Sequence, residues 1–166
     1  MKNKKIIIGI VVIGVLAFMI IIGVATYNGL NYAGNYQKSI YEDDSKIISE
    51  SDSYSYVHRT STTSGERLKS KFRLTGMNTI YDIYADEDTT ININYNVNIT
   101  DGKFKIVLIA PDDEVITILE ESGEGTKEIN IKSGESRVKI VGRDAKCDIN
   151  ISIDAKENVD IKLRNE

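Results

Sequence analysis

Hydrophobic and polar residues follow two different patterns along the chain. Residues 6–25 are continuously apolar, whereas apolar residues recur at every second position in several stretches after residue 54. Twenty apolar residues at 1.5 Å per residue make a helix of about 30 Å, the thickness of a bilayer's hydrocarbon core. The sequence therefore predicts one N-terminal transmembrane helix followed by an all-β domain.

Charge is distributed unevenly around the apolar stretch. Lys2, Lys4 and Lys5 precede it, and no other charged residue occurs before Lys38. Positive charge beside a transmembrane helix marks its cytoplasmic side. We therefore expect residues 1–5 to form a cytoplasmic tail of a single-pass cell-membrane protein whose C-terminal domain lies outside.

A cleaved signal peptide is the competing interpretation of the same stretch. The small residues Gly23 and Ala25 suit a signal peptidase, and cleavage there would release a secreted protein. However, the apolar core of a signal peptide usually has about 7–15 residues, and residues 6–25 exceed that length. We therefore expect an uncleaved anchor; the intact mass of the mature protein distinguishes the two.

Residues 26–53 are mostly polar, with Asn, Gly, Ser and acidic residues. Leu30, Ile40 and Ile47 give only a weak helical spacing. This composition is typical of a flexible linker, so we expect a polar stalk with one or two helical turns.

Alternation of apolar and polar residues defines the outer domain, residues 54–166. It is clearest in residues 90–100, where five apolar residues alternate with four asparagines, and it predicts a strand with one face on a core and the other in water. The asparagines are Asn92, Asn94, Asn96 and Asn98. Residues 104–110, FKIVLIA, are apolar at every position but Lys105, which predicts a central strand covered on both faces.

Other segments predict further strands, separated by residues that favour turns. The segments are 54–63, 68–74, 80–84, 115–120, 128–132, 136–141, 147–153 and 159–163. Asp101-Gly102 suits a hairpin, whereas Pro111 and Gly134 mark later turns. About 8–10 short antiparallel strands argue for a β-sandwich or jelly roll. A β-solenoid is the alternative, although no fixed repeat is visible.

Composition and charge limit the chemistry of this domain. Without the three N-terminal lysines, 18 basic residues face 25 acidic ones, a net charge of about −7 that repels nucleic acid. Cys147 is the one cysteine, so an internal disulfide and a multi-cysteine metal site are excluded. The domain must therefore be stabilised by its core.

Two segments carry a family resemblance. Residues 102–112, GKFKIVLIAPD, and residues 134–142, GESRVKIVG, resemble parts of small membrane-anchored β-sandwich proteins on the outer surface of low-GC Gram-positive bacteria. The resemblance implies a surface-exposed sandwich and supplies no activity or site residue.

Candidate nucleophiles and bases are few. His58 is the one histidine and would need Cys147, Ser or Thr beside it to form a dyad; we interpret it as a surface residue. Cys147 is in register with three isoleucines, which predicts a buried, inert thiol.

Acidic clusters at residues 86–88 and 112–114 lie in predicted loops, where carboxylates can hold calcium. We interpret them as solvated loops, because the spacing of a calcium-binding motif is missing; a pair of glycosidase carboxylates would leave no sequence pattern. The asparagine row is either a hydrogen-bonding face for a glycan or wall polymer, or a plain solvent face, which we favour.

No catalytic, cofactor-binding or metal-binding residue is assigned, and no cofactor is expected. The sequence favours a non-enzymatic, membrane-tethered interaction or structural domain at the cell surface. Its partners would be the membrane and an envelope protein or cell-wall polymer, not nucleic acid. The alternative is a calcium-dependent carbohydrate-binding or hydrolytic domain that uses the acidic loops.

Overall fold

The structure is a computed structural model that describes residues 2–164, with side chains described from residue 13 onward. The chain divides into two compact units, residues 1–35 and residues 36–166.

One helix, α1, spans Lys2–Ile40 and contains the whole predicted transmembrane segment. Its described apolar side chains within the predicted transmembrane segment are exposed: Ile13, Phe18 and Ile20 are 68%, 64% and 67% exposed. Exposed apolar surface of this extent is typical of a segment covered by lipid or by a partner. The helix is long and apolar enough to cross a membrane or to act as a signal anchor.

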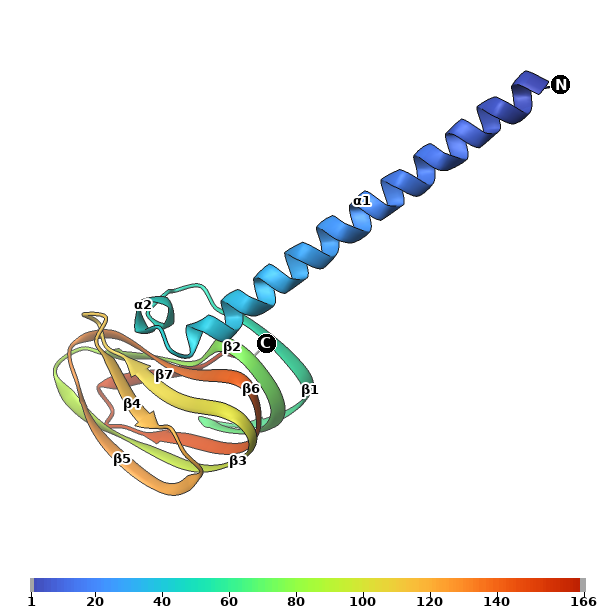
Figure 1. The fold of residues 1–166 in the computed structure, drawn as a ribbon. Helices are drawn as coiled ribbons and strands as arrows, with labels where there is room; N and C mark the ends of the chain where they lie inside the picture. The colour runs from blue at the N-terminus through green and yellow to red at the C-terminus, as the bar shows by residue number, and fades with distance from the viewer. Residues whose placement is uncertain (1, 165–166) are drawn as a thin grey trace. The chain divides into compact units, whose positions relative to one another are not determined.

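The second unit is an antiparallel β-sandwich built from seven strands and a short helix (Figure 1). The helix is α2, Asp44–Ile47; the strands are β1 (Ser53–Ser64), β2 (Arg67–Ala85), β3 (Thr89–Ile109), β4 (Val115–Leu119), β5 (Gly123–Ile131), β6 (Gly134–Asp154) and β7 (Val159–Leu163). Three of these strands, β2, β3 and β6, have about twenty residues, long enough to serve two layers.

Strand pairing divides the sandwich into two layers, here called sheet I and sheet II. In sheet I the order is β1, the first half of β2, the second half of β6, the first half of β3, and β5. In sheet II it is β7, the second half of β2, the first half of β6, the second half of β3, and β4. Each long strand therefore passes from one layer to the other.

Glycines lie where the long strands change layer. Gly76 in β2 pairs with Gly142 in β6, and the strand register shifts beside Gly76 and beside Gly102 in β3. Gly76 and Gly102 have φ of +101° and +72°. A Cβ on Gly76 would lie 2.0 Å from the Ser53 carbonyl oxygen, and one on Gly102 would lie 2.4 Å from that of Asp144. Strands switch sheets through such bulges, and only glycine fits the close backbone approach.

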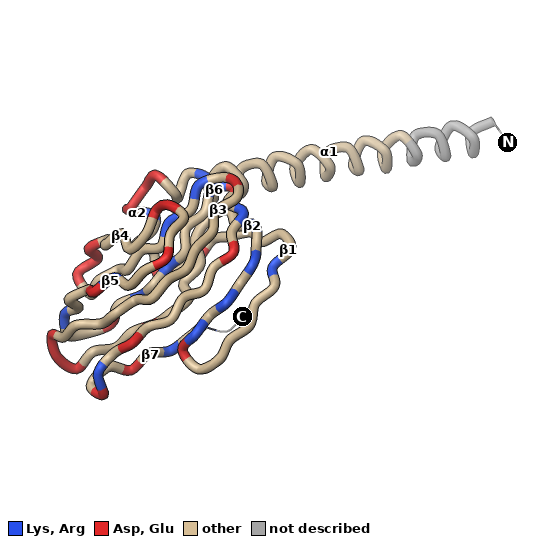
Figure 2. Tube along the Cα trace, turned by 90° about the horizontal axis from the view of Figure 1, so that it is seen from below, with Lys and Arg blue, Asp and Glu red and all other residues tan. Residues whose placement is uncertain are grey.

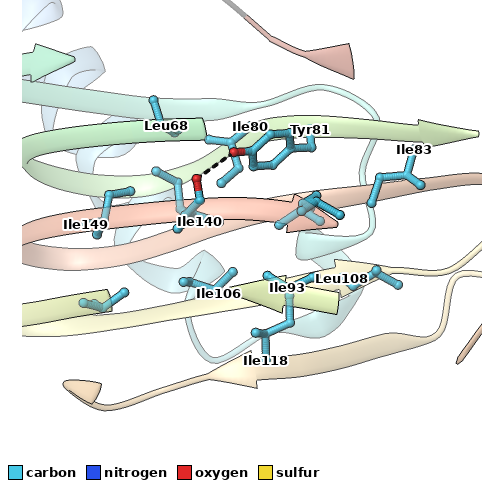
Figure 3. Close-up of a cluster of buried hydrophobic side chains, with 14 of the residues drawn as sticks. Leu68, Ile80, Tyr81, Ile83, Ile93, Ile106, Leu108, Ile118, Ile140 and Ile149 are labelled. Atoms are coloured by element: carbon cyan, nitrogen blue, oxygen red, sulfur yellow. Dashed lines mark hydrogen bonds between the residues drawn. The ribbon is translucent and has the colours of Figure 1, made fainter. Parts of the chain in front are cut away.

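The main core lies between the two layers (Figure 3). Ile93 and Ile149 from sheet I and Ile106 and Ile140 from sheet II are buried there. The ring of Tyr81 is fully buried among them, and its hydroxyl lies 2.6 Å from one backbone carbonyl oxygen and 3.1 Å from another. A buried hydroxyl needs such partners, so this residue fixes the packing of the two layers.

A second, smaller core lies on the outer face of sheet II. There the end of α1, helix α2 and the connecting chain, residues 36–52, form a cap. Ile40, Tyr41 and Ile47 of the cap are buried against Val107 and Val141 of the sheet. The structure therefore differs from the predicted polar stalk over residues 26–53: helix α1 runs to its end at Ile40, and the cap packs on the domain.

The predicted antiparallel β-sandwich is confirmed, and so is the central strand at residues 104–110, which is buried on both faces. The predicted hairpin at Asp101-Gly102 is wrong. These residues form a bulge in the continuous strand β3, and similar continuations join residues 68–74 to 80–84 and 136–141 to 147–153. The ten predicted segments are therefore seven strands, because three pairs of segments are fused.

Candidate functional site

The outer face of sheet I is the large open surface of the domain. Its residues alternate along each strand with buried core residues, and the outward positions of β2, β3 and β6 are all polar. We call this surface the polar face; its members are Arg67, Lys69, Lys71 and Arg73 of β2, Asn92, Asn94, Asn96 and Asn98 of β3, and Lys146, Asp148, Asn150, Ser152 and Asp154 of β6. The row of asparagines thus lies near the middle of a five-stranded layer.

Two of the asparagines hydrogen-bond across strands. The Asn94 amide donates to Asp154 of β6 at 2.7 Å and accepts from the Thr126 hydroxyl of β5 at 2.6 Å. The Asn96 amide donates to Glu124 at 2.8 Å. These bonds hold the amides in a fixed array while leaving further donors and acceptors facing solvent. The array can therefore offer hydrogen bonds to a polar ligand.

Basic residues form a second row on the polar face, along β2 (Figure 2). Lys71 pairs with Asp148 at 2.7 Å, and Arg73 pairs with Asp101 at 2.9 Å. The Arg73 guanidinium holds the pKa of the Asp101 carboxyl below its usual value. Sequence analysis missed this row, although four basic residues at alternate positions were its signal.

Three hollows follow one another along the polar face. The first has a volume of about 490 Å³ and lies between the β1 bulge and Asn98; its lining includes Lys71 and Lys146. The second, about 270 Å³, lies over the Asn94–Asn96 stretch, and the third, about 410 Å³, lies over Asn92. The three hollows combine apolar lining with amide, hydroxyl and charged groups, and their succession along the strands suits an extended ligand.

His58 and Cys147 line the same first hollow, so the structure brings the two candidate residues together. His58 lies in the β1 bulge with φ of +55° and is exposed, as predicted. Cys147 is buried, and burial raises the pKa of its thiol to about 12. Among the described residues no hydrogen bond joins them, and a neutral thiol is a poor nucleophile. The predicted inert thiol fits this geometry.

The two acidic loops meet at the turn between β5 and β6. Asp112 pairs with Lys132, which lowers the pKa of the carboxyl, and Asp88 accepts the backbone N–H of Ser133 at 2.9 Å. Over residues 13–164 no group of three or more potential metal ligands converges. Two of the loop carboxylates, those of Asp88 and Asp112, therefore bind the turn between β5 and β6, and a third, that of Glu87, accepts from Asn158.

The cap covers the middle of the opposite outer face, that of sheet II, whereas Tyr84 on the same face is 56% exposed. Lys139 is fully buried under it and binds the Ser49 carbonyl and, at 3.3 Å, the Asp52 carboxylate. Arg137 donates to the Ile48 and Ser49 carbonyls at 3.0 and 3.2 Å. Desolvation lowers the pKa of Lys139, and its pairing with Asp52 offsets part of that shift. Of the two outer faces, that of sheet II is covered at its middle by the cap, and the polar face has no such cover among the described residues.

Comparison with known proteins adds little. No family model matches the chain, and no curated protein matches it. Among solved structures, the crystal structure of procruciferin, an 11S globulin from Brassica napus, is similar over 58% of this chain at 14% identity and a TM-score of 0.29. The chain spans about a fifth of that globulin (22%), and a likeness at this TM-score carries no argument about fold or function.

Proposed function

We propose that the protein is a non-enzymatic interaction domain, tethered to the cell membrane by α1, that binds a polar polymer of the bacterial envelope through the polar face. The observation that carries the proposal is the difference between the two outer faces of the sandwich. The cap covers one with apolar side chains and buried cations, whereas the other exposes amides, hydroxyls and charges around three hollows.

The chemistry of the polar face favours a polymer over a protein partner. The centre of a protein–protein interface is usually apolar and rich in aromatic residues. Val57, 49% exposed, lines the first hollow, but the outward positions of β2, β3 and β6 hold amide, hydroxyl and charged groups. An array of hydrogen-bonding groups on rigid strands matches a ligand that is itself rich in hydroxyls or amides, such as a wall glycan.

The membrane tether and its orientation belong to the same proposal. The apolar side chains of α1 from Ile13 to Val24 are exposed, and three lysines precede the apolar stretch. By the positive-inside rule the sandwich lies outside the cell membrane, where a wall polymer is within reach.

Binding of the full chain, in detergent micelles, to insoluble cell-wall material tests the proposal. Wild type sediments with the wall, and a variant that combines Asn96→Ala with Asn150→Ala loses most of this binding. The matched control combines Asn28→Ala with Asn158→Ala, which lie on α1 and on the loop before β7, and it binds like wild type. Equal melting temperatures establish that all three are folded. Wild type that stays in solution, or equal binding by both variants, refutes the proposal.

A further inference from the structure

The basic row of β2 repeats with a fixed spacing. Arg67, Lys69, Lys71 and Arg73 occupy every second position of the strand and face the same side. Two residues of an antiparallel strand span about 6.8 Å, so the row presents a positive charge at that interval. Because the strand is paired on both sides, the spacing is fixed by the sheet.

The charge of this row is only half balanced. Lys71 and Arg73 pair with Asp148 and Asp101, whereas within residues 13–164 no ion pair involves Arg67 or Lys69. The row therefore keeps two uncompensated cations in a chain whose net charge is −4. Lys146, which lies beside Arg73 in the sheet, adds another positive charge at the first hollow.

Neutral hydrogen-bonding residues flank the two uncompensated cations. Lys69 lies between Thr62 of β1 and Asn150 of β6, and Arg67 is opposite Ser64 of β1. An anion over this part of the row would meet guanidinium and ammonium charges together with hydroxyl and amide donors. Phosphate is recognised by this combination, and the arginine fork can bind two of its oxygens.

From this spacing and charge we propose that the basic row of β2 binds a linear polyol polymer that carries one phosphodiester group per repeat. A three-carbon polyol phosphate repeat has a length similar to the 6.8 Å interval between the basic residues, so successive phosphates can meet successive cations. This inference rests on the proposed function and names the class of polymer that the polar face takes.

Single-stranded nucleic acid has a similar phosphate spacing, but the face does not suit it. Proteins that bind it stack bases on aromatic rings beside the basic groove. Along the outward rows of β2, β3 and β6 described above, no position holds an aromatic residue. Hydroxyl and amide groups occupy the places where bases would stack, which favours a polyol.

Poly(glycerol phosphate) titrated against the full chain in micelles tests the inference. The two uncompensated cations give log K a slope of about −1.4 against log salt, at about −0.7 for each phosphate contact. Arg67→Gln combined with Lys69→Gln makes the slope shallower by about 1.4 and lowers affinity at least about tenfold at low salt. The control, Lys127→Gln with Lys162→Gln, removes the same charge from β5 and β7 and leaves affinity and slope near wild type.

Uncharged dextran and an oligothymidylate are titrated in the same way, as controls for a polymer without phosphate and for single-stranded nucleic acid. The inference is overturned if the Arg67/Lys69 variant keeps the wild-type slope, or if dextran or the oligothymidylate binds as tightly as poly(glycerol phosphate). Wild type that sediments with wall material but ignores poly(glycerol phosphate) also overturns it while the proposed function stands. Wild type that binds neither refutes both.

Discussion

Replacing Gly76 by alanine tests the claim that β2 crosses between layers at this residue. Gly76 has φ of +101°, and an added Cβ would lie 2.0 Å from the carbonyl oxygen of Ser53 on the neighbouring strand. A non-glycine residue at positive φ costs roughly 1–3 kcal/mol, and overpacking against a neighbour costs about 1–3 kcal/mol more. We expect Gly76→Ala to lower the free energy of unfolding by about 2–6 kcal/mol.

Gly65→Ala is the matched control, because Gly65 also has positive φ, +58°, but an added Cβ meets nothing within 4 Å. It loses about 1–2 kcal/mol from backbone strain alone. Urea unfolding of the full chain in micelles, followed by the circular dichroism of the sheet, measures both. The two variants differ by the clash of the added Cβ, about 1–3 kcal/mol. With a slope of about 1–3 kcal/mol per molar urea, their midpoints differ by roughly 0.3–3 M. Equal midpoints would refute the crossing at Gly76.

Three further experiments test the two cores. Tyr81→Phe removes the hydroxyl that donates its one hydrogen to the Glu66 carbonyl and also lies 3.1 Å from the buried Ile151 carbonyl, and it lowers the unfolding free energy by about 1–3 kcal/mol in urea titration. No change would show that water reaches this site. Asp52→Asn removes the carboxylate partner of the buried Lys139 ammonium and destabilises the domain by about 3–5 kcal/mol. The double variant with Lys139→Met recovers most of the lost stability. A double variant as unstable as the single one contradicts this account. Burial raises the pKa of the Cys147 thiol to about 12, so a thiol reagent at neutral pH leaves it unmodified until urea unfolds the domain. The intact mass of the protein measures this labelling. Labelling of the folded protein would contradict the burial of Cys147.

The sequence pattern predicted where the strands lie but not which predicted segments join into one longer strand. Asp101-Gly102 supplies a residue that accepts positive φ, and Gly102 does adopt φ of +72°. The same conformation serves a hairpin and a bulge. The outcome depends on whether a partner strand continues past the bend, and β6 does so on both sides of Gly142. That partner lies far away in the sequence, so local pattern alone could not decide between hairpin and bulge.

The cap could have been inferred from the strand that it covers. Residues 104–110 are apolar on both faces, so the outward Val107 and Ile109 required a cover on sheet II. Ile40 and Ile47 supply it, but the polar residues around them made the segment resemble a linker. Isolated apolar residues in a polar segment can be recognised as core residues only together with the apolar sheet face that they cover.

The candidate site was predicted in part. Strict alternation placed the four asparagines on the solvent side of the strand, as the structure has them. The basic row of β2 follows from the same alternation in residues 67–73, yet a net charge averaged over the domain concealed it. The hollows and the open or covered state of each outer face depend on strand order, which the sequence does not contain.

Hydrogen–deuterium exchange of the full chain, with and without soluble wall fragments, tests the central claim most directly. The account predicts that bound fragments slow amide exchange in the sheet I parts of β2, β3 and β6, around Lys69, Asn96 and Asn150, and leave the exchange of residues 36–52 unchanged. Protection confined to the cap or to sheet II, or no protection at fragment concentrations that saturate binding, would contradict it.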